Sequence, residues 1–289
     1  MTNPILSVVI PTWNRAAIVC EAVASALKQR VGEVEVIVVD DASTDETIAL
    51  LNRTFGPQIR VLRLEERRGP GAARNAGAEL AQGEFVAFLD SDDVWLPEKL
   101  DVELRVFAEF PEANAVVSDS RNFFEGVAVG SSRFAQNGLL TATQGAIRLA
   151  EDCAWLWTNS TSTAHTCGIT VRRSVLAQLG RTLFAEDLSC CEDWEFQMRL
   201  YQLGRIVILP DVYSWVRRFD DDSRLGRGIP GTPPTREQEL MLLQARLTVI
   251  ERSRPWLEGL RADLAIELER FRVETEVRLK RLKVKVQTA

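Results

Sequence analysis

The first 115 residues alternate short apolar runs with longer segments of helical periodicity. Runs rich in valine, isoleucine and leucine predict buried strands at residues 7–11, 34–39, 59–64 and 84–89. Amphipathic segments predict helices at residues 16–30, 44–55, 71–82 and 96–110, the last with Pro97 in its first turn. Buried strands separated by helices are typical of a parallel sheet covered on both faces, so the sequence predicts an α/β fold.

The remaining residues follow a different pattern. Residues 116–225 are less regular, and residues 226–235 (GRGIPGTPPT) hold three glycines and three prolines, which is typical of a linker. Beyond them, apolar residues at helical spacing predict helices at 236–253 and 256–286, separated at Pro255. We therefore divide the chain into four parts: 1–115, 116–225, a linker at 226–235 and a C-terminal helical extension at 236–289.

Composition and charge exclude several classes of protein. Of the 289 residues, 46% are hydrophobic and 26% charged, which supplies a core and excludes a wholly disordered chain. The formal net charge of −6 argues against a nucleic-acid partner. No apolar run reaches the roughly 20 residues of a membrane-spanning helix, and the N-terminus lacks the basic start of a signal peptide. The five cysteines have no C-x-x-C spacing, so we expect free thiols in a cytoplasmic protein.

Polar clusters directly follow three of the predicted strands. They are TWNR at residues 12–15, DDAS at residues 40–43 and DSDD at residues 90–93. In open α/β sheets, ligands bind beyond the carboxyl ends of the strands. The three clusters therefore predict a binding site at one edge of the sheet.

The third cluster is strongly acidic. Asp90, Asp92 and Asp93 repel one another unless a cation or hydrogen-bond donors compensate their charges. Carboxylate oxygens on a tight loop suit Mg²⁺ or Mn²⁺ held together with substrate phosphates. The alternative is a helix cap followed by acidic residues that favour a helix N-terminus, with residues 95–97 opening that helix. The residues leave both interpretations open.

Asp40 and Asp41 repeat the arrangement after the second strand. Either could cap the following helix. A doubled aspartate at the end of a central strand is costly, however, so we expect one of the two to accept hydrogen bonds from a ligand, such as the imide of a uracil or ribose hydroxyls.

The segment from Gly69 to Gly71 suggests a dinucleotide-binding fingerprint, but Arg74 occupies the third glycine position and no strand runs directly into the segment. A glycine-rich approach to a helix N-terminus with an arginine nearby still suits a nucleotide phosphate or base.

Glu192 and Asp193 begin an amphipathic helix that runs to Leu203. One interpretation is again helix capping. The other is a base, because a carboxylate flanked by Trp194 and Phe196 is partly desolvated. Desolvation raises a carboxyl pKa from about 3.9 toward values useful for proton abstraction.

Taken in order, five stretches of this sequence resemble the inverting GT-A glycosyltransferases of family 2. They read SVVIPTWNR, VVDDASTDET, RGPGAARNAG, FLDSDDVWLPEKL and EDWEF, and they cover roughly residues 5–220. The resemblance implies a GT-A fold, which is Rossmann-like with a mostly parallel sheet flanked by helices. Residues 1–115 would then bind a nucleotide sugar, and residues 116–225 would bind the acceptor and supply the catalytic base.

The activity implied is a metal-dependent, inverting transfer of a sugar to an acceptor hydroxyl or amine, in glycan or natural-product biosynthesis. The donor implied is a nucleotide sugar, usually a UDP-sugar. Asp193 would be the general base with Glu192 in support, and Asp92 with Asp90 would hold the Mg²⁺ or Mn²⁺ ion. The donor-binding residues implied are Pro11, Thr12, Arg15, Asp40, Asp41, Arg74, Asp90, Ser91, Asp92, Arg217 and Arg218.

Tryptophans are the candidates for contacts with the acceptor. Trp155, Trp157 and Trp194 could stack on a sugar ring, although packing in the core or a lid is favoured for Trp155 and Trp157. For Cys190 and Cys191, beside the expected base, we predict buried thiols.

The sequence departs from the family pattern beyond the expected base. Many members carry a Tyr-Arg-x-His-type segment that serves the diphosphate or the metal, whereas residues 215–220 here read WVRRFD, with no histidine. The single histidine, His165, lies far upstream, and we expect it to be packed or on the acceptor side. Residues 180–184 (GRTLF) also differ from the Gly-Phe-Asp-type loop usual before the base.

Alternatives remain open for both the C-terminal extension and the function. The extension could dock on the body, form a homodimer, or contact an anionic membrane surface through the basic residues 280–285. The whole chain could also be a catalytically inactive sugar-nucleotide-binding or scaffold protein. The retained aspartates argue against this alternative, and the missing histidine keeps it open. A nucleotidyltransferase is less favoured, because PTWNR stands where such enzymes have a glycine-rich loop.

Overall fold

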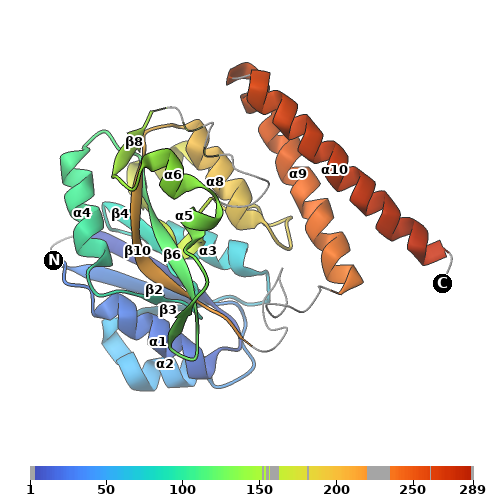
Figure 1. The fold of residues 1–289 in the computed structure, drawn as a ribbon. Coiled ribbons are helices and arrows are strands. Elements are labelled where there is room, and N and C mark those ends of the chain that lie inside the picture. The colour runs from blue at the N-terminus through green and yellow to red at the C-terminus, as the bar shows by residue number, and fades with distance from the viewer. Residues whose placement is uncertain are drawn as a thin grey trace.

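The computed structural model describes residues 4–151, 153, 156, 163–180, 182–219, 235–260 and 262–287. A single curled sheet runs through the body of the molecule, and a pair of long helices stands against one side of it (Figure 1). The strand order is β3-β2-β1-β4-β9-β6-β10-β5, with β7 paired to β6 and β8 paired to β10.

The first half of the sheet is parallel. Its strands are β1 (Leu6–Thr12), β2 (Val34–Asp40), β3 (Arg60–Arg63) and β4 (Phe85–Phe88). Strand β1 pairs with β2 along its whole length, so Thr12 lies opposite Asp40, and it pairs with β4 on the other side. The carboxyl ends of β1, β2 and β4 therefore meet at one edge of the sheet, as the sequence predicts.

Helices cover both faces of this half. They are α1 (Ala16–Leu27), α2 (Thr47–Phe55), α3 (Pro70–Leu80) and α4 (Lys99–Glu109). Val8 packs in a core with residues of α1, α2 and α4, whereas its neighbour Val9 packs on the opposite face with α3. Helix α3 lies so close to the sheet that a Cβ on Gly77 would sit 2.4 Å from a methyl carbon of Val9.

The helix predicted at residues 96–110 begins later, at Lys99. The backbone N–H of Trp95 donates to Ser25 Oγ over 3.2 Å, and that of Leu96 donates to the Tyr213 carbonyl over 2.9 Å. These bonds hold β5 (Val94–Trp95) as a short strand antiparallel to β10. The acidic cluster at residues 90–93 therefore does not cap this helix, which removes the capping interpretation.

The second half is mixed in direction. Strand β9 lies between β4 and β6 and is antiparallel to both, while β6 and β10 are parallel. Its remaining elements are β6 (Ala115–Phe124), β7 (Val127–Val129), β8 (Arg148–Ala150), β9 (Ile169–Arg172), β10 (Ile206–Arg217), α5 (Arg133–Gln136), α6 (Leu139–Thr143), α7 (Arg173–Leu176) and α8 (Glu192–Gln202). Short 3₁₀ turns lie at η1 (Gly56–Gln58), η3 (Thr166–Gly168) and η4 (Ala177–Leu179).

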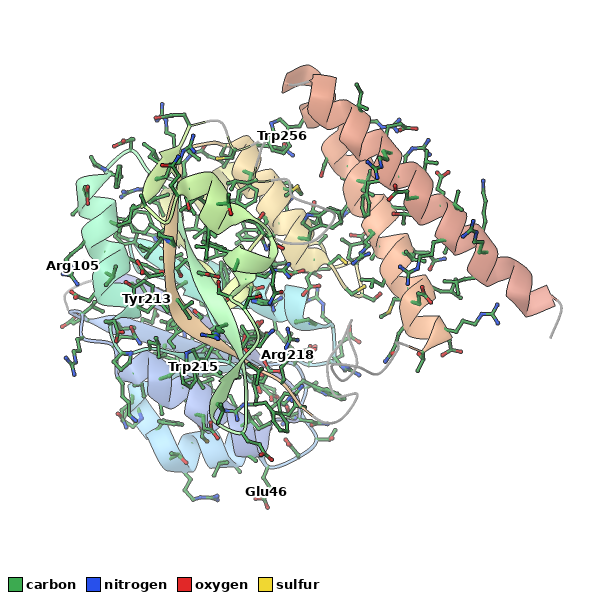
Figure 2. All side chains as sticks on the ribbon, in the orientation of Figure 1. Glu46, Arg105, Tyr213, Trp215, Arg218 and Trp256 are labelled. Carbon is green, nitrogen blue, oxygen red and sulfur yellow. The ribbon has the colours of Figure 1, made fainter. Side chains whose placement is uncertain are left out.

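The C-terminal residues form a helical hairpin of α9 (Arg236–Leu260) and α10 (Ala262–Gln287). The break predicted at Pro255 is wrong, because Pro255 lies inside α9. Val249 and Ile250 are fully buried against the body, and Trp256 packs there too (Figure 2). This packing on both sides of Pro255 outweighs the one backbone hydrogen bond that proline removes.

Helix α9 thus docks on the body, one of the three alternatives for the extension. A homodimer and a contact with an anionic membrane both stay predictions. None of the helices among the described residues is long and apolar enough to cross a membrane. The predicted linker falls outside the described residues except for Thr235.

Candidate active site

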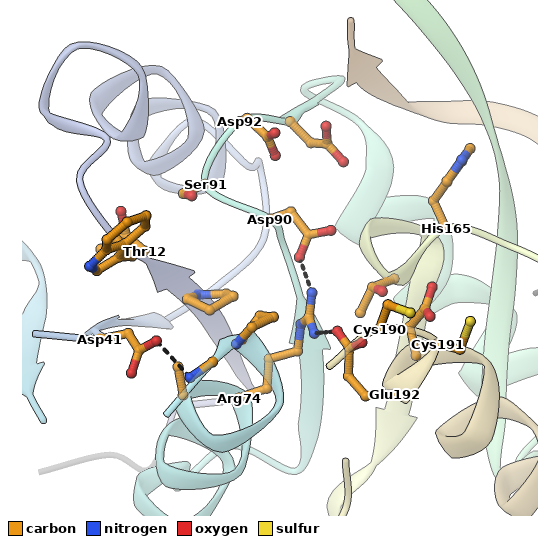
Figure 3. Close-up of a pocket in the computed structure, with 18 of the residues that line it drawn as sticks. Thr12, Asp41, Arg74, Asp90, Ser91, Asp92, His165, Cys190, Cys191 and Glu192 are labelled. Atoms are coloured by element: carbon orange, nitrogen blue, oxygen red, sulfur yellow. Dashed lines mark hydrogen bonds and ion pairs between the residues drawn. The ribbon is translucent and has the colours of Figure 1, made fainter. Parts of the chain in front are cut away.

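A cavity of about 420 Å³ opens where β1, β2 and β4 end. Pockets for small ligands in proteins usually measure about 300–1,000 Å³, so this one suits a small molecule. Its wall is formed in part by the strand ends, the start of α3 and the start of α8 (Figure 3). Leu242 and Arg246 of α9 also line it. The expected site residues that line it are Pro11, Thr12, Arg15, Asp41, Arg74, Asp90, Ser91, Asp92, Glu192, Asp193, Trp194 and Arg218.

Two expected donor-binding residues lie behind the wall. Asp40 is fully buried and accepts a hydrogen bond from the Ser43 backbone N–H over 3.0 Å, so it holds the loop after β2. Arg217 donates from its backbone to Asp93 over 3.0 Å and from Nε to the Asp92 carbonyl over 3.1 Å. Both residues shape the site from outside the cavity. Trp155 and Trp157 lie outside the described residues.

Asp41 organises the loop that leads into α3. Its two carboxylate oxygens accept hydrogen bonds from the backbone N–H groups of Arg68, over 2.7 Å, and Gly69, over 2.8 Å. Gly69 has φ 90°, a left-handed conformation that favours glycine. Each oxygen keeps a further lone pair for a ligand. The loop thereby directs the N-terminus of α3 at the cavity, an arrangement that suits an anion.

Arg74 joins the two acidic parts of the site. Its Nη2 donates to Asp90 over 2.6 Å and its Nη1 donates to Glu192 over 2.9 Å (Figure 3). The guanidinium also lies over the Phe184 ring, 5.1 Å from its centre. The side chain is 5% exposed, and burial alone lowers the pKa of Arg74. The charges and hydrogen bonds of Asp90 and Glu192 outweigh that effect, so the pKa of Arg74 is raised and its charge is permanent.

The start of α8 is fixed by local backbone geometry. Cys191, the residue before the helix, has φ 65°, so the chain turns sharply and brings Glu192 and Asp193 to the cavity. The incoming segment is held by Asn75, which exchanges hydrogen bonds with both backbone groups of Phe184 over 2.8 and 2.9 Å. Residues 75 and 184 thereby place α8 relative to α3.

Asp193 has the environment of a base. The side chain is half-buried at the cavity wall, and its Oδ1 accepts a hydrogen bond from the Trp194 backbone N–H over 2.8 Å. Burial, followed by the charge of the nearby Glu192, raises the pKa of Asp193 to about 6, against the opposing effect of the Arg74 charge. A carboxyl with this pKa is ionised at neutral pH and accepts a proton readily. The direction of this shift is the one expected from desolvation of the carboxyl.

The acidic loop fits a divalent ion only in part. Among the described residues, no three His, Cys, Asp or Glu side chains gather closely enough to hold an ion by themselves. Asp90 is bound by Arg74, whereas the Asp92 carboxylate lines the cavity with a guanidinium nitrogen of Arg15 at 3.9 Å. Mg²⁺ and Mn²⁺ often bind through one or two carboxylates with substrate phosphates and water. The donor set suits such a shared ion and does not suit a closed protein cage.

His165 and the two cysteines also reach the cavity. His165 is half-buried in the wall, and its Nδ1 lies 2.7 Å from Ser120 Oγ. We expected His165 to be either packed or on the acceptor side of the site. Its place in the cavity wall leaves a contact with the acceptor as a prediction. Cys190 is buried and Cys191 half-buried, and both line the cavity as free thiols.

Several residues that line the cavity were not among the expected site residues. They include Trp13 and Arg133, the latter on α5. The Arg67 guanidinium lies over the Trp13 ring, 3.5 Å from its centre, in a cation–π contact. Trp13 lies in the first polar cluster, so its position after β1 was a usable signal. Leu242 and Arg246 carry no such signal, because they reach the cavity only through the docking of α9.

Comparison with known families gives a match over most of the body. The family described as "Glycosyl transferase family 2" matches residues 7–180. The succinoglycan biosynthesis protein ExoO of Rhizobium meliloti is 44% identical over 97 residues, which are 34% of this chain and 28% of ExoO. The Escherichia coli UDP-Glc:alpha-D-GlcNAc-diphosphoundecaprenol beta-1,3-glucosyltransferase WfgD is 34% identical over 104 residues, 36% of this chain and 41% of WfgD. The chain thus matches less than half the length of these relatives.

Solved structures show the same architecture. The structure of S. aureus TarS 1–349 with UDP has a TM-score of 0.60 and 25% identity, covering 85% of this chain and 65% of that one. The mannosyltransferase PcManGT from Pyrobaculum calidifontis, in complex with GDP-Man and Mn²⁺, has a TM-score of 0.66 and 21% identity, covering 100% of this chain and 76% of that one. The predicted GT-A architecture is confirmed by these likenesses.

Proposed function

We propose that this chain, which belongs to glycosyl transferase family 2, transfers a sugar from a UDP-sugar to an acceptor hydroxyl during the synthesis of a cell-surface glycan. The observation that carries the proposal is the cavity itself. It combines Asp193, a carboxyl with a pKa of about 6, with the carboxylate of Asp92 and the N-terminus of α3. A base and an anion-binding edge within one cavity are what transfer from a nucleotide sugar requires.

The nucleoside is proposed to bind at the ends of β1 and β2. Pro11 and Thr12 line this part of the cavity, and the second lone pairs of the Asp41 carboxylate are available to the imide of a uracil. The structures of S. aureus TarS with UDP and with UDP-GlcNAc support uridine as the base to test first. Because Arg68 and Gly69 already hold Asp41, its carboxylate needs no rearrangement to bind a ligand.

The diphosphate is proposed to lie beside Asp92. Arg15 and Arg218 line the cavity and bring positive charge to its oxygens, and the start of α3 adds the partial charge of a helix N-terminus. Asp92 would hold a divalent ion there, with Asp90 near it. Such an ion, when bound, stabilises the negative charge that develops on the leaving diphosphate.

Asp193 is proposed to remove the proton of the acceptor hydroxyl. As that oxygen forms its bond to the anomeric carbon of the donor, the bond from that carbon to the diphosphate breaks and UDP leaves with the electron pair. A single displacement inverts the anomeric centre. Glu192 supports the base electrostatically, since its charge raises the pKa of Asp193. WfgD is named for an acceptor sugar that a diphosphate joins to a lipid, which makes a lipid-linked sugar the first acceptor class to test.

Calorimetric titration of the purified chain with UDP, GDP and dTDP, each with and without Mn²⁺, tests the donor site. We expect UDP to bind tightly only with Mn²⁺, and GDP and dTDP to bind more weakly. Binding of UDP without transfer to any acceptor or water would favour the inactive sugar-nucleotide-binding role. Release of pyrophosphate from a nucleoside triphosphate and a sugar phosphate would favour a nucleotidyltransferase. Absence of binding by all three nucleotides would refute the proposed donor.

A further inference from the structure

Helix α9 forms a fixed wall of the cavity. It lies along α8 (Figure 1), where Val249 and Ile250 are fully buried in the core that includes α8. An ion pair between Arg252 Nη2 and Asp187 Oδ2, 2.6 Å apart, joins α9 to the segment before α8. The carboxyl of Asp187 has a lowered pKa because of this arginine. The position of α9 is therefore set by apolar packing and by charge.

The same face of α9 reaches the cavity one and two turns earlier. Residues 242, 246, 249 and 253 follow helical spacing, so the face that packs on α8 also presents Leu242 and Arg246. Both of these residues line the cavity. The charge of Arg246 acts on the Cys190 and Cys191 thiols, where it opposes the larger effects that raise the pKa of Cys191. Arg246 therefore lies within electrostatic reach of the residues that precede α8, and it lines the same cavity as Asp193.

A second arginine from outside residues 1–115 also lines the cavity. Arg133, on α5, lines the cavity and is 8% exposed. Neither arginine belongs to residues 1–115, where the proposed donor contacts concentrate, and Arg246 also lies beyond residue 180, where the family match ends. The two side chains come from α5 and α9 and line the cavity together with Asp193.

We propose that Arg246, with Arg133, binds a phosphate group of the acceptor and so makes this chain selective for phosphorylated acceptors. The inference rests on the proposed function and assigns its acceptor side. A guanidinium offers a planar pair of N–H donors that matches two phosphate oxygens, and it keeps its charge at every working pH. Leu242, one turn before Arg246, supplies apolar surface beside the phosphate for the carrier or the sugar ring.

In the competing assignment, Arg246 and Arg133 bind the diphosphate of the donor. The donor and the proposed acceptor both carry phosphate, so the test must show which of the two the arginines bind. We would compare three versions of the 289-residue chain: wild type, Arg246→Gln and the matched control Arg254→Gln. Arg254 lies on the same helix, but it pairs with Glu269 of α10 over 2.7 Å and is not part of the cavity wall. Both variants lose one positive charge from α9.

Binding is measured by calorimetry with two probes. The first is a water-soluble short-chain prenyl diphosphate of N-acetylglucosamine, and the second is methyl α-N-acetylglucosaminide, which has no phosphate. Each is titrated with and without saturating UDP and Mn²⁺, and UDP is titrated separately. Equal far-ultraviolet circular dichroism and equal melting temperatures verify that the variants fold.

We expect Arg246→Gln to lower the affinity for the phosphorylated probe about tenfold or more. This is the loss in affinity that follows removal of a hydrogen bond between charged groups. The same variant should bind UDP within about twofold of wild type and should bind the methyl glycoside equally. Arg254→Gln should match wild type throughout.

Three results would overturn the inference: equal binding of the phosphorylated probe by wild type and Arg246→Gln, no binding of that probe by wild type, or a loss of UDP affinity as large as the loss of probe affinity. If wild type fails to bind UDP but binds the phosphorylated probe through Arg246, the proposed donor fails and the inference stands.

Discussion

Arg74 donates a hydrogen bond to Glu192 over 2.9 Å, although the two residues are 118 positions apart in the chain. The other end of the guanidinium donates to Asp90 over 2.6 Å. One buried side chain therefore connects the acidic loop after β4 to the first turn of α8. The charge of Arg74 also acts on Asp193, the neighbour of Glu192, and lowers its pKa.

Replacing Arg74 by glutamine should move the pH dependence of transfer. The charge of Arg74 favours the ionised form of Asp193, so its loss raises the pKa of that carboxyl above about 6. Only the ionised form accepts a proton, so the acid limb of the kcat/KM profile should shift to higher pH. A matched control is Arg68→Gln, because Arg68 pairs with Glu186 at the surface and its side chain is 51% exposed. If the acid limb of the kcat/KM profile is unchanged in Arg74→Gln, the Arg74 charge does not control the pKa of Asp193.

The wild-type profile and an Asp193 variant test the base itself. With the pKa of Asp193 at about 6, kcat/KM should be half-maximal near that pH and fall tenfold for each unit below it. Asp193→Asn should reduce kcat by about 10²–10⁴-fold while UDP affinity stays within about twofold. Asp101→Asn, at the exposed pair with Arg105, is the control. Full transfer activity in Asp193→Asn would refute the assignment.

Much of the fold could be predicted because β1 and β2 are apolar on both faces. Val8 and Val9 both need cover, and only a sheet between two layers of helices provides it. The antiparallel strand β9 could not be placed from the sequence. Its Val171 pairs with Val86 of β4 and with Ala115 of β6, and these partners come from distant segments that local periodicity does not specify.

The site was predictable where chemistry follows a strand end. Asp41, Asp90 and Asp92 come directly after β2 and β4, and all three line the cavity. Asp40 does not, because successive side chains of a strand point in opposite directions and Asp40 is the last residue of β2. Arg246 was missed because its position depends on how α9 packs on α8, which helical periodicity leaves undetermined.

Asp92→Asn tests the shared divalent ion. The carboxylate lines the cavity, and an amide oxygen is a weaker, uncharged ligand for Mn²⁺. We expect the variant to lose the gain in UDP affinity that Mn²⁺ gives wild type, measured by calorimetry. Titration of the same variant without metal is the internal control and should match metal-free wild type. Retention of the full metal effect would show that the ion is held elsewhere.

Helix α4 offers a matched test of buried and exposed charge. Lys99 and Glu103 form a fully buried ion pair with a separation of 2.6 Å, and Ser118 and Thr170 also donate to the Glu103 carboxylate, over 3.0 and 2.7 Å. Arg105 pairs with Asp101 at the same helical spacing on the exposed side, with a separation of 2.7 Å.

Lys99→Met leaves the Glu103 carboxylate buried without its cation and should lower the free energy of unfolding by about 3–5 kcal/mol. Arg105→Met should change it by about 0.5 kcal/mol or less, since exposed pairs are screened by water. Urea unfolding followed by circular dichroism measures both. The double variant Lys99→Met with Glu103→Leu should recover most of the loss, because it removes the unpaired charge as well. A similar small effect for both single variants would mean that water reaches Glu103 and that the pair is not buried in solution.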